Sequence, residues 1–394
     1  MNSSESTTTS GAKRYEYLDF SRGIIMALMA LDHSSFFWNC CRFTDEGLRG
    51  NFTQYANIAQ LITRVITHFA PTTFIWLSGF MVATSALKRL NRRDTENTVS
   101  WHFTLRGIIL IVLHLTILNL GFEIAGYLNG NLKEIFLLQV LWTIGINMII
   151  LAWLRRLGIT FLTIVALLIF FVFPFFGSQL LLFTNSNSVL YALGIVTFAP
   201  TLNPDAPLFC IYPIIPWNGV MAFGYLCGIV FHRYSQMLSN ERLVRIYALT
   251  GISLFIVFLI LRYANGYGNY LVWKELTFQQ FVTISKYPPS LVYLFFTFGQ
   301  MFILFAVSLK LELCGMYQKF PFQAIMVYGR VPLFFYCTHI LFYGPFPVLF
   351  GIQNQYNLST VYLVWILGMA LMYKPCKWYF QYKMTHPQSL ARYI

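Results

Sequence analysis

About ten apolar runs, each near 20 residues long, constrain this chain more than any other feature. An α-helix rises 1.5 Å per residue, so about 20 residues cross the ~30 Å hydrocarbon core of a bilayer. The runs are too long and continuous to alternate as the strands of a membrane barrel do. We therefore predict an all-α, polytopic integral membrane helical bundle with spans at residues 17–38, 58–87, 104–122, 132–153, 158–176, 213–232, 246–263, 289–309, 324–345 and 358–373.

The composition agrees with a chain that is largely surrounded by lipid. Hydrophobic residues make up 57% of it and charged residues only 10%, whereas ordinary globular domains carry about 25% charged residues. The formal net charge of +13 does not indicate nucleic-acid binding. The Lys and Arg residues fall in short groups between apolar runs, whereas a phosphate-binding surface gathers them on one solvated face.

These basic groups also predict the orientation. They follow the second, fourth, sixth, eighth and tenth predicted spans, while residues 177–212 contain no Lys or Arg. Cytoplasmic loops carry the excess of Lys and Arg, so we expect both termini in the cytoplasm and a place in a bacterial inner membrane. We divide the chain into a disordered polar tail (1–13), one membrane domain (14–374) with outer loops at 177–212 and 264–288, and a cytoplasmic tail (375–394).

The first predicted span carries ionisable residues, which are costly within a bilayer and therefore mark candidate sites. Asp19 and Arg22 are three residues apart, which makes them neighbours on one helix face. His33 shares the face of Arg22, three turns or about 16 Å further along the axis. Asp32 points roughly 100° away from His33, so we expect it to meet another helix. An interfacial anchor would explain Asp19 and Arg22, but it would not explain the deeper Asp32–His33 pair.

The second and ninth spans add further ionisable residues. Arg64 and His68 are four residues apart on the second span, and the ninth carries Arg330 and His339. Following the topology, His33, His68 and His339 all fall in the outer half of the membrane. Three imidazoles at similar depth can converge, and a lone His that bonds across helices is the simpler alternative. No closely spaced HxxxH or HxxE pair is present, so we expect no metal site.

Polar residues also mark the outer ends of the sixth and eighth spans. Asn218 follows Trp217, and Lys286 with Tyr287 precedes a Pro-Pro pair. Trp and Tyr are common interfacial anchors, yet Asn218 and Lys286 also suit the polar mouth of a substrate site. We therefore predict a substrate-binding set of Asp19, Asn218, Lys286 and Tyr287.

These groups together permit acyl transfer. A His can act as general base toward a sugar hydroxyl or amine, or accept the acyl group itself. An adjacent Asp can orient the imidazole where geometry allows, and Arg side chains can bind the phosphates of a thioester cofactor such as CoA. We predict a catalytic set of His33, Asp32, His68 and His339 and a cofactor-binding set of Arg22, Arg64 and Arg330.

Two other functions are compatible with parts of this pattern. A transporter of a small polar solute could use intramembrane Asp, His and Arg as a proton or anion path. Paired broken-helix repeats, which would favour it, are not evident. A membrane scaffold would leave the deep His and Arg residues without a purpose. The sequence leaves the oligomeric state open, a homo-oligomer included.

Several of these segments resemble a known family. They resemble the heparan-α-glucosaminide N-acetyltransferase-like membrane family, within the broader transmembrane acyltransferase superfamily. The similar segments extend over nearly the whole chain: Leu18–Gly23 with Asp32-His33, Thr63–Pro71, Ser78-Gly79, Ser285–Ser290, Tyr328–Tyr336 and Pro375–Trp378.

The resemblance implies transfer of an acetyl group from acetyl-CoA to a sugar, with a central His. In the lysosomal branch, the His proposed for catalysis lies shortly before the second span, but residues 39–57 here contain no His. Either His33 or His68 then takes that role, or this branch carries out a different reaction. We expect a membrane-embedded acetyltransferase that uses cytoplasmic acetyl-CoA and an envelope glycan or small-molecule acceptor, with the lipid bilayer as its surroundings.

Overall fold

The computed structural model describes residues 15–42, 55–119, 136–175, 208–386 and 388–389. The first half contains helices α1 (Glu16–Trp38), α2 (Ile58–Thr67), α3 (Ala70–Asn91), α4 (Glu96–Leu113), α6 (Val140–Leu154) and α7 (Ile159–Leu167). The second half contains α10 (Ile214–Tyr234), α11 (Asn240–Ala264), α12 (Phe278–Val282), α13 (Leu291–Leu313), α14 (Phe322–Arg330), α15 (Pro332–Tyr343), α16 (Pro345–Leu349) and α17 (Leu358–Thr385). Strands β1 (Phe136–Leu138) and β2 (Leu208–Cys210) form one short parallel pair.

The described helices confirm the membrane bundle. Eight of these helical segments are long and apolar enough to cross a membrane, and Ile159–Phe175 is a shorter apolar helix. Helix α1 has 23 residues, enough for about 35 Å at 1.5 Å per residue, and it carries four charged residues, Glu16, Asp19, Arg22 and Asp32. Together with α1 and the helix Ile159–Phe175, the eight segments account for the ten expected crossings. The chain is an integral, multi-pass membrane protein.

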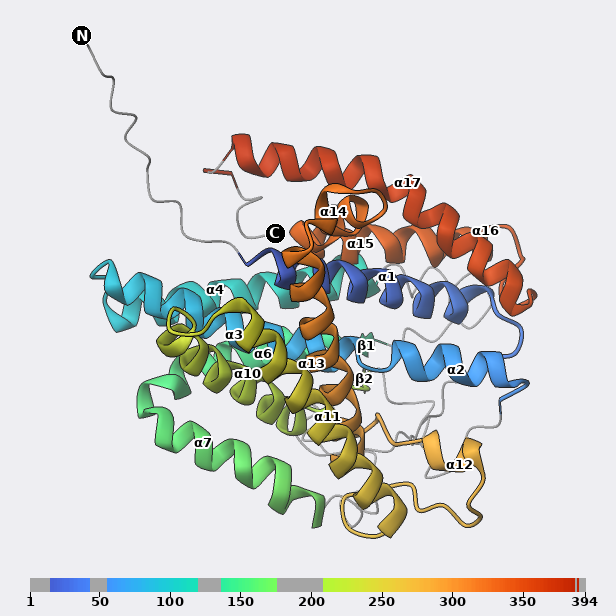
Figure 1. The fold of residues 1–394 in the computed structure, drawn as a ribbon. Helices are drawn as coiled ribbons and strands as arrows, with labels where there is room; N and C mark the ends of the chain where they lie inside the picture. Colours follow the sequence, from blue (N-terminus) through green and yellow to red (C-terminus); the bar gives the residue numbers. More distant parts are fainter. Residues whose placement is uncertain (1–14, 43–54, 120–135, 176–207, 387, 390–394) are drawn as a thin grey trace.

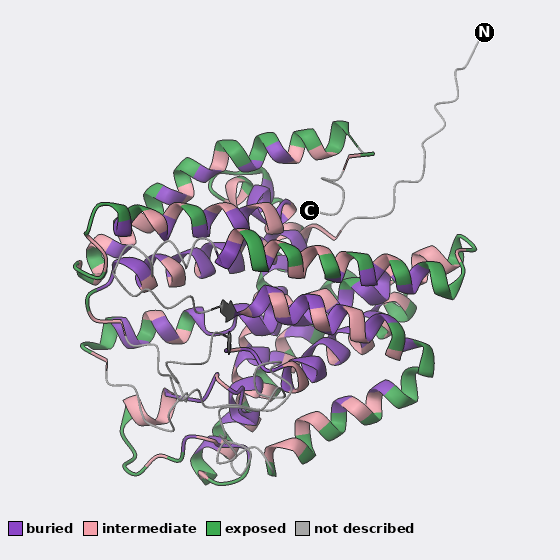
Figure 2. Cartoon of the chain, turned by 180° about the vertical axis from the view of Figure 1, so that it is seen from behind, coloured by how far each residue is buried: buried purple, intermediate pink, exposed green. Residues whose placement is uncertain are grey.

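Helix α1 lies near the middle of the bundle (Figure 1). It contacts α14, α15 and α17 on one side and α2 and α3 on the other. The pairs α3–α10, α11–α13 and α4–α6 make the other large contacts, and α7 packs at the edge against α10. In Figure 2 the buried residues concentrate in the central helices, while the outer helices expose one face.

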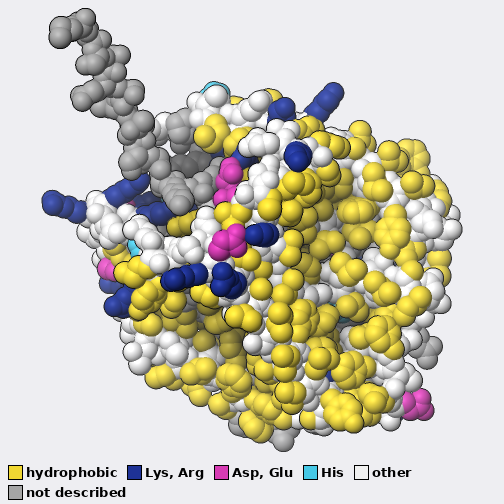
Figure 3. Space-filling model, viewed as in Figure 1, with side chains coloured by type: hydrophobic (Ala, Val, Ile, Leu, Met, Phe, Trp, Pro, Cys, Tyr) yellow, Lys and Arg dark blue, Asp and Glu magenta, His cyan; other side chains and the backbone are white. Residues whose placement is uncertain are grey.

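The two ends of the bundle differ in charge. Figure 3 shows an extensive hydrophobic surface, with Lys and Arg gathered near the α3–α4 turn, the α10–α11 turn and the last part of α17. We call this the basic end. Apolar side chains are exposed around the bundle on α4, α7, α11 and α17, including Leu249, Leu259 and Leu371, as expected for helices that face lipid.

Two predicted spans are interrupted. The span expected at 58–87 is divided between α2 and α3 at His68 and Phe69, where Pro71 lacks the N–H that would continue the helix. The span expected at 324–345 is divided at Val331, because the ring of a following proline disfavours the helical conformation.

Other boundaries also differ from the prediction. Helix α4 begins at Glu96, before the expected residue 104, because Thr95 caps it by accepting a hydrogen bond from the backbone N–H of Thr98. Helix α17 continues through Pro375 to Thr385, well into the expected C-terminal tail. The expected N-terminal tail and most of the loop 177–212 lie outside the described residues.

The loop 264–288, which we expect on the outer side, is organised by Arg262, which is fully buried. Its guanidinium donates hydrogen bonds to the side chain of Asn269 and to the carbonyls of Leu271, Gln280, Phe281 and Thr283 over 2.6–3.0 Å. The planar fork of Arg suits several fixed acceptors at once. This loop leads directly into the segment that carries Lys286.

Candidate functional site

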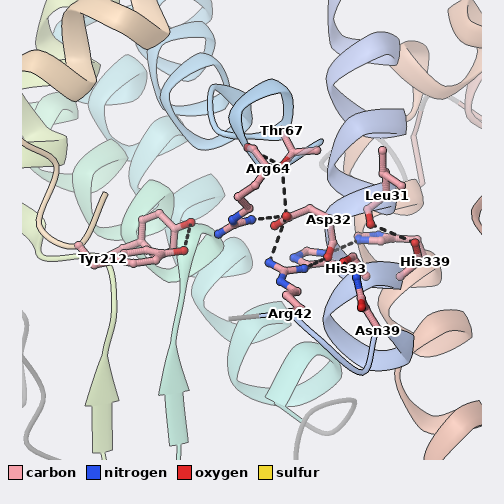
Figure 4. A network of polar contacts seen from close by, with 12 residues as sticks. Leu31, Asp32, His33, Asn39, Arg42, Arg64, Thr67, Tyr212 and His339 are labelled. Carbon is pink, nitrogen blue, oxygen red and sulfur yellow. Dashed lines mark hydrogen bonds and ion pairs between the residues drawn. The ribbon is translucent and has the colours of Figure 1, made fainter. Parts of the chain in front are cut away.

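Two of the predicted histidines meet near the middle of the bundle. The Nδ1 atom of His33, on α1, lies 2.7 Å from Nε2 of His339, on α15, and the two rings stack with centroids 5.0 Å apart. Figure 4 shows them side by side, although 306 residues separate them in the sequence. His339 is fully buried, and the ring of Tyr336 borders both imidazoles.

The hydrogen bonds assign the proton positions of a neutral pair. His339 Nδ1 lies 2.9 Å from the carbonyl oxygen of Phe335, which can only accept, so this nitrogen carries hydrogen. In a neutral ring, Nε2 of His339 then accepts a hydrogen bond from Nδ1–H of His33. The remaining nitrogen of His33, Nε2, has the lone pair and can take up a proton. A neutral pair is favoured here because an unpaired buried charge is costly.

Asp32 does not orient His33 but lies in an ion cluster beside it. Its carboxylate forms ion pairs with Arg64 on α2 and with Arg42, whose Nη2 is 3.1 Å away. Thr67 donates a further hydrogen bond over 3.2 Å. Figure 4 shows the three side chains converging on Asp32. The expectation that Asp32 meets another helix is confirmed, and its cluster fixes α2 against the end of α1.

A small pocket of about 40 Å³ lies next to the imidazoles. Lys286 is 2% exposed, lines this pocket, and holds its Nζ 5.1 Å from the ring centroid of Tyr287. The hydroxyl groups of Tyr287 and Tyr212 lie 3.3 Å apart. The pocket is enclosed by Met29, Asp32, His33, Thr67, Ala70, Pro71, Phe74, Gln139, Val140, Tyr212, Lys286 and Tyr336.

A larger cavity of about 390 Å³ borders this pocket. Four of its lining residues are basic: Arg22, Arg106, Arg330 and Lys383. The remaining lining residues are mainly apolar, and the polar Ser78 and Ser85 also line the cavity. Phe74, Val140 and Tyr336 line both the cavity and the small pocket. A long molecule with an anionic end could therefore place its other end beside the imidazoles.

The family model described as heparan-alpha-glucosaminide N-acetyltransferase, catalytic, matches residues 14–263. The chain belongs to this family. A search of curated proteins found no match. The matched residues include Asp32, His33 and Arg106, whereas His339 comes from beyond them. In this N-acetyltransferase family member, the C-terminal helices therefore complete the candidate site.

The structure separates the predicted cofactor-binding residues into two groups. Arg22 and Arg330 line the large cavity, each with an acidic neighbour: Arg22 is 2.8 Å from Asp19, and Arg330 is 3.2 Å from Glu16. The adjacency of Asp19 and Arg22 is thus as expected. Arg64 lies apart from that cavity and holds Asp32 instead.

Of the remaining predicted residues, Lys286 lines the small pocket and two others lie elsewhere. His68, at the junction of α2 and α3, packs beside Tyr293 with ring centroids 6.0 Å apart. Of the three histidines that the sequence places at similar depth, the structure thus brings His33 and His339 into contact. Asn218 donates a hydrogen bond to Asn147 over 3.1 Å, joining α10 to α6. Among the described residues, no group of three or more His, Cys, Asp or Glu could hold a metal ion.

Sequence reasoning overlooked three residues of the site. Arg106 lies within an expected span, so the same cost of intramembrane charge could have identified it. Arg42 and Tyr212 stand in polar or turn-rich stretches with no comparable signal. They reach the site only because the chain folds back after α1 and before α10.

Proposed function

We propose that this protein is a membrane acetyltransferase that moves the acetyl group of cytoplasmic acetyl-CoA to a sugar amine or hydroxyl on the outer side. The observation that carries the proposal is the shared wall between the basic cavity and the imidazole pocket. Acetyl-CoA is elongated, with phosphates at one end and the thioester at the other. Arg22 and His33 are about 16 Å apart along α1 by the helix rise, which suits such a molecule.

In the proposed reaction, His33 is the general base. Its Nε2 removes a proton from the acceptor amine or hydroxyl as that group attacks the thioester carbonyl. The Nε2 of His339 keeps the reactive tautomer of His33 in place. Lys286 is the charged group best placed to stabilise the developing oxyanion. The CoA thiolate then leaves toward the basic cavity.

The first test is calorimetric binding of acetyl-CoA to the purified protein in detergent. Arg106→Gln and Arg330→Gln should each weaken binding about tenfold, because a hydrogen bond to a charged group contributes about 1.5–3 kcal/mol. Arg245→Gln is the matched control, since this arginine is exposed on α11 and does not line the cavity. Its affinity should stay at the wild-type value.

A second variant separates binding from chemistry. His33→Ala should still bind acetyl-CoA but lose transfer to a glucosamine acceptor by about a hundredfold or more, as expected for removal of a general base. Folded protein that binds no acetyl-CoA would contradict the proposal and favour a transporter. Full transfer by correctly inserted His33→Ala would contradict the role of His33.

A further inference from the structure

Two adjacent cysteines, Cys40 and Cys41, follow the last turn of α1 at the end of the bundle opposite the basic end. Their Sγ atoms lie 2.9 Å apart, with one thiol donating to the other. Cys40 is exposed and Cys41 is partly buried. Neither thiol takes part in the proposed reaction.

The backbone around this pair is held on three sides. The N–H of Cys40 donates to the carbonyl of Tyr356 over 2.9 Å, and the N–H of Cys41 donates to the side chain of Asn39 over 3.0 Å. The carbonyl of Cys41 accepts a hydrogen bond from Gln60 over 2.6 Å. Contacts from α2 and from the segment before α17 therefore fix the turn in which the two sulfur atoms meet.

We propose that Cys40 and Cys41 form a redox modification site, a vicinal dithiol that closes to a disulfide by exchange with a disulfide-containing molecule in the outer compartment. The thiolate of one cysteine attacks the donor disulfide, forms a mixed disulfide and releases one donor thiolate. The thiolate of the other attacks the mixed disulfide and releases the second. The donor gains two electrons and the two protons, and the protein gains one S–S bond.

The location of the pair supports this chemistry. The distribution of Lys and Arg puts this end of the bundle outside the cytoplasm, where disulfides form and persist. The hydrogen bond that the Cys40 thiol shares with Cys41 raises the pKa of Cys40, so less thiolate is present at neutral pH and exchange should accelerate as the pH rises.

A disulfide between two adjacent cysteines is also easily reduced. Consecutive Cα atoms are about 3.8 Å apart, below the range of about 4.4–6.8 Å found for ordinary disulfides. The resulting ring is strained, and strained, exposed disulfides are the ones that reductants open most easily. The site is therefore suited to a reversible change.

The next residue links this site to the ion cluster. Arg42 places Nη2 3.1 Å from the carboxylate of Asp32. Closure of the ring must twist the peptide between Cys40 and Cys41 and so displace the backbone that leads into Arg42. We expect acetyl transfer to fall when the ring closes, and this consequence rests on the proposed function.

The test uses the full-length protein in sealed vesicles oriented with the Cys40–Cys41 end facing the medium, treated with oxidised glutathione and followed by mass spectrometry of the cysteine-containing peptides. The peptide with Cys40 and Cys41 should lose the mass of two hydrogens and carry no glutathione, and reduction should restore it. Cys41→Ser should instead retain glutathione on Cys40. Cys314, exposed after α13, is the control: in permeabilised vesicles it should only form a glutathione adduct.

Two measurements keep the conclusions separate. A peptide that stays reduced, or that carries glutathione on both cysteines, would overturn the modification site whatever the activity. Closure with unchanged acetyl transfer would overturn the link through Arg42 and leave the site established. Absence of acetyl transfer before any oxidant is added would count against the proposed function. The mass measurement would still show whether Cys40 and Cys41 form a disulfide.

Discussion

The two imidazoles show how a single hydrogen bond assigns chemical roles. His339 cannot present a proton on Nε2 while its Nδ1 donates to the Phe335 carbonyl and the ring is neutral. His33 must then donate from Nδ1, which leaves its Nε2 as the basic nitrogen. His339 therefore acts as a positioning residue, while His33 is the proposed base.

This assignment predicts a graded effect at His339. Gln can offer an acceptor close to the position of Nε2, whereas Phe fills the space without one. We expect His339→Gln to retain a substantial part of the transfer rate and His339→Phe to lose about a hundredfold in kcat, with little change in acetyl-CoA affinity. Steady-state kinetics with calorimetry would test this, and equal rates for the two variants would contradict the positioning role.

At the scale of the element, close helix contacts set the positions of the site residues relative to one another. The backbones of α1 and α14 meet at Gly23 and Gly329, where an added Cβ would collide with backbone atoms. Small residues let membrane helices approach in this way. The contact fixes α1, which carries Asp32 and His33, against the helices that carry Arg330 and His339.

Gly329→Ala should therefore destabilise the protein, by about 1–3 kcal/mol as is typical of overpacking. The expected result is a lower thermal unfolding midpoint in detergent, with reduced transfer because α15 moves relative to α1. Gly266→Ala is the matched control: its nearest contact would be 3.7 Å away, so its midpoint should change little. Unchanged stability of Gly329→Ala would show that the helices can separate without cost.

At the scale of the whole molecule, the basic cavity and the small pocket together suggest from which side of the bilayer each proposed substrate enters. Arg22, Arg106, Arg330 and Lys383 line the cavity, while Lys286 lines the pocket from the loop before α13, which we expect on the outer side. The proposed donor and acceptor thus approach from opposite sides, as the alternating Lys and Arg of the loops suggest.

This arrangement predicts sided activity in sealed vesicles of uniform orientation. Acetyl-CoA should support transfer only when it is supplied at the basic end, and opening the vesicles with detergent should remove the difference. Orientation can be established by labelling Cys314, which lies at that end, with a membrane-impermeant thiol reagent. Equal rates with donor on either side would contradict the direction that we propose.

The sequence by itself determined the membrane class and the approximate positions of the helical spans. These follow from local properties, because span length, helix rise and the cost of intramembrane charge depend on residues close together in the chain. The same local geometry correctly separated Asp32 from His33 by their angle around α1.

Only the tertiary structure decided which of these residues meet. Contact between His33 and His339, the ion pairs of Asp32 with Arg42 and Arg64, and the place of His68 beside Tyr293 depend on helix packing and on two proline-associated breaks. A helix period gives the direction of a side chain around its own axis, but it does not give the rotation or the neighbours of that helix in the bundle. Those depend on contacts between distant residues such as Gly23 and Gly329, and folding is required to bring these together.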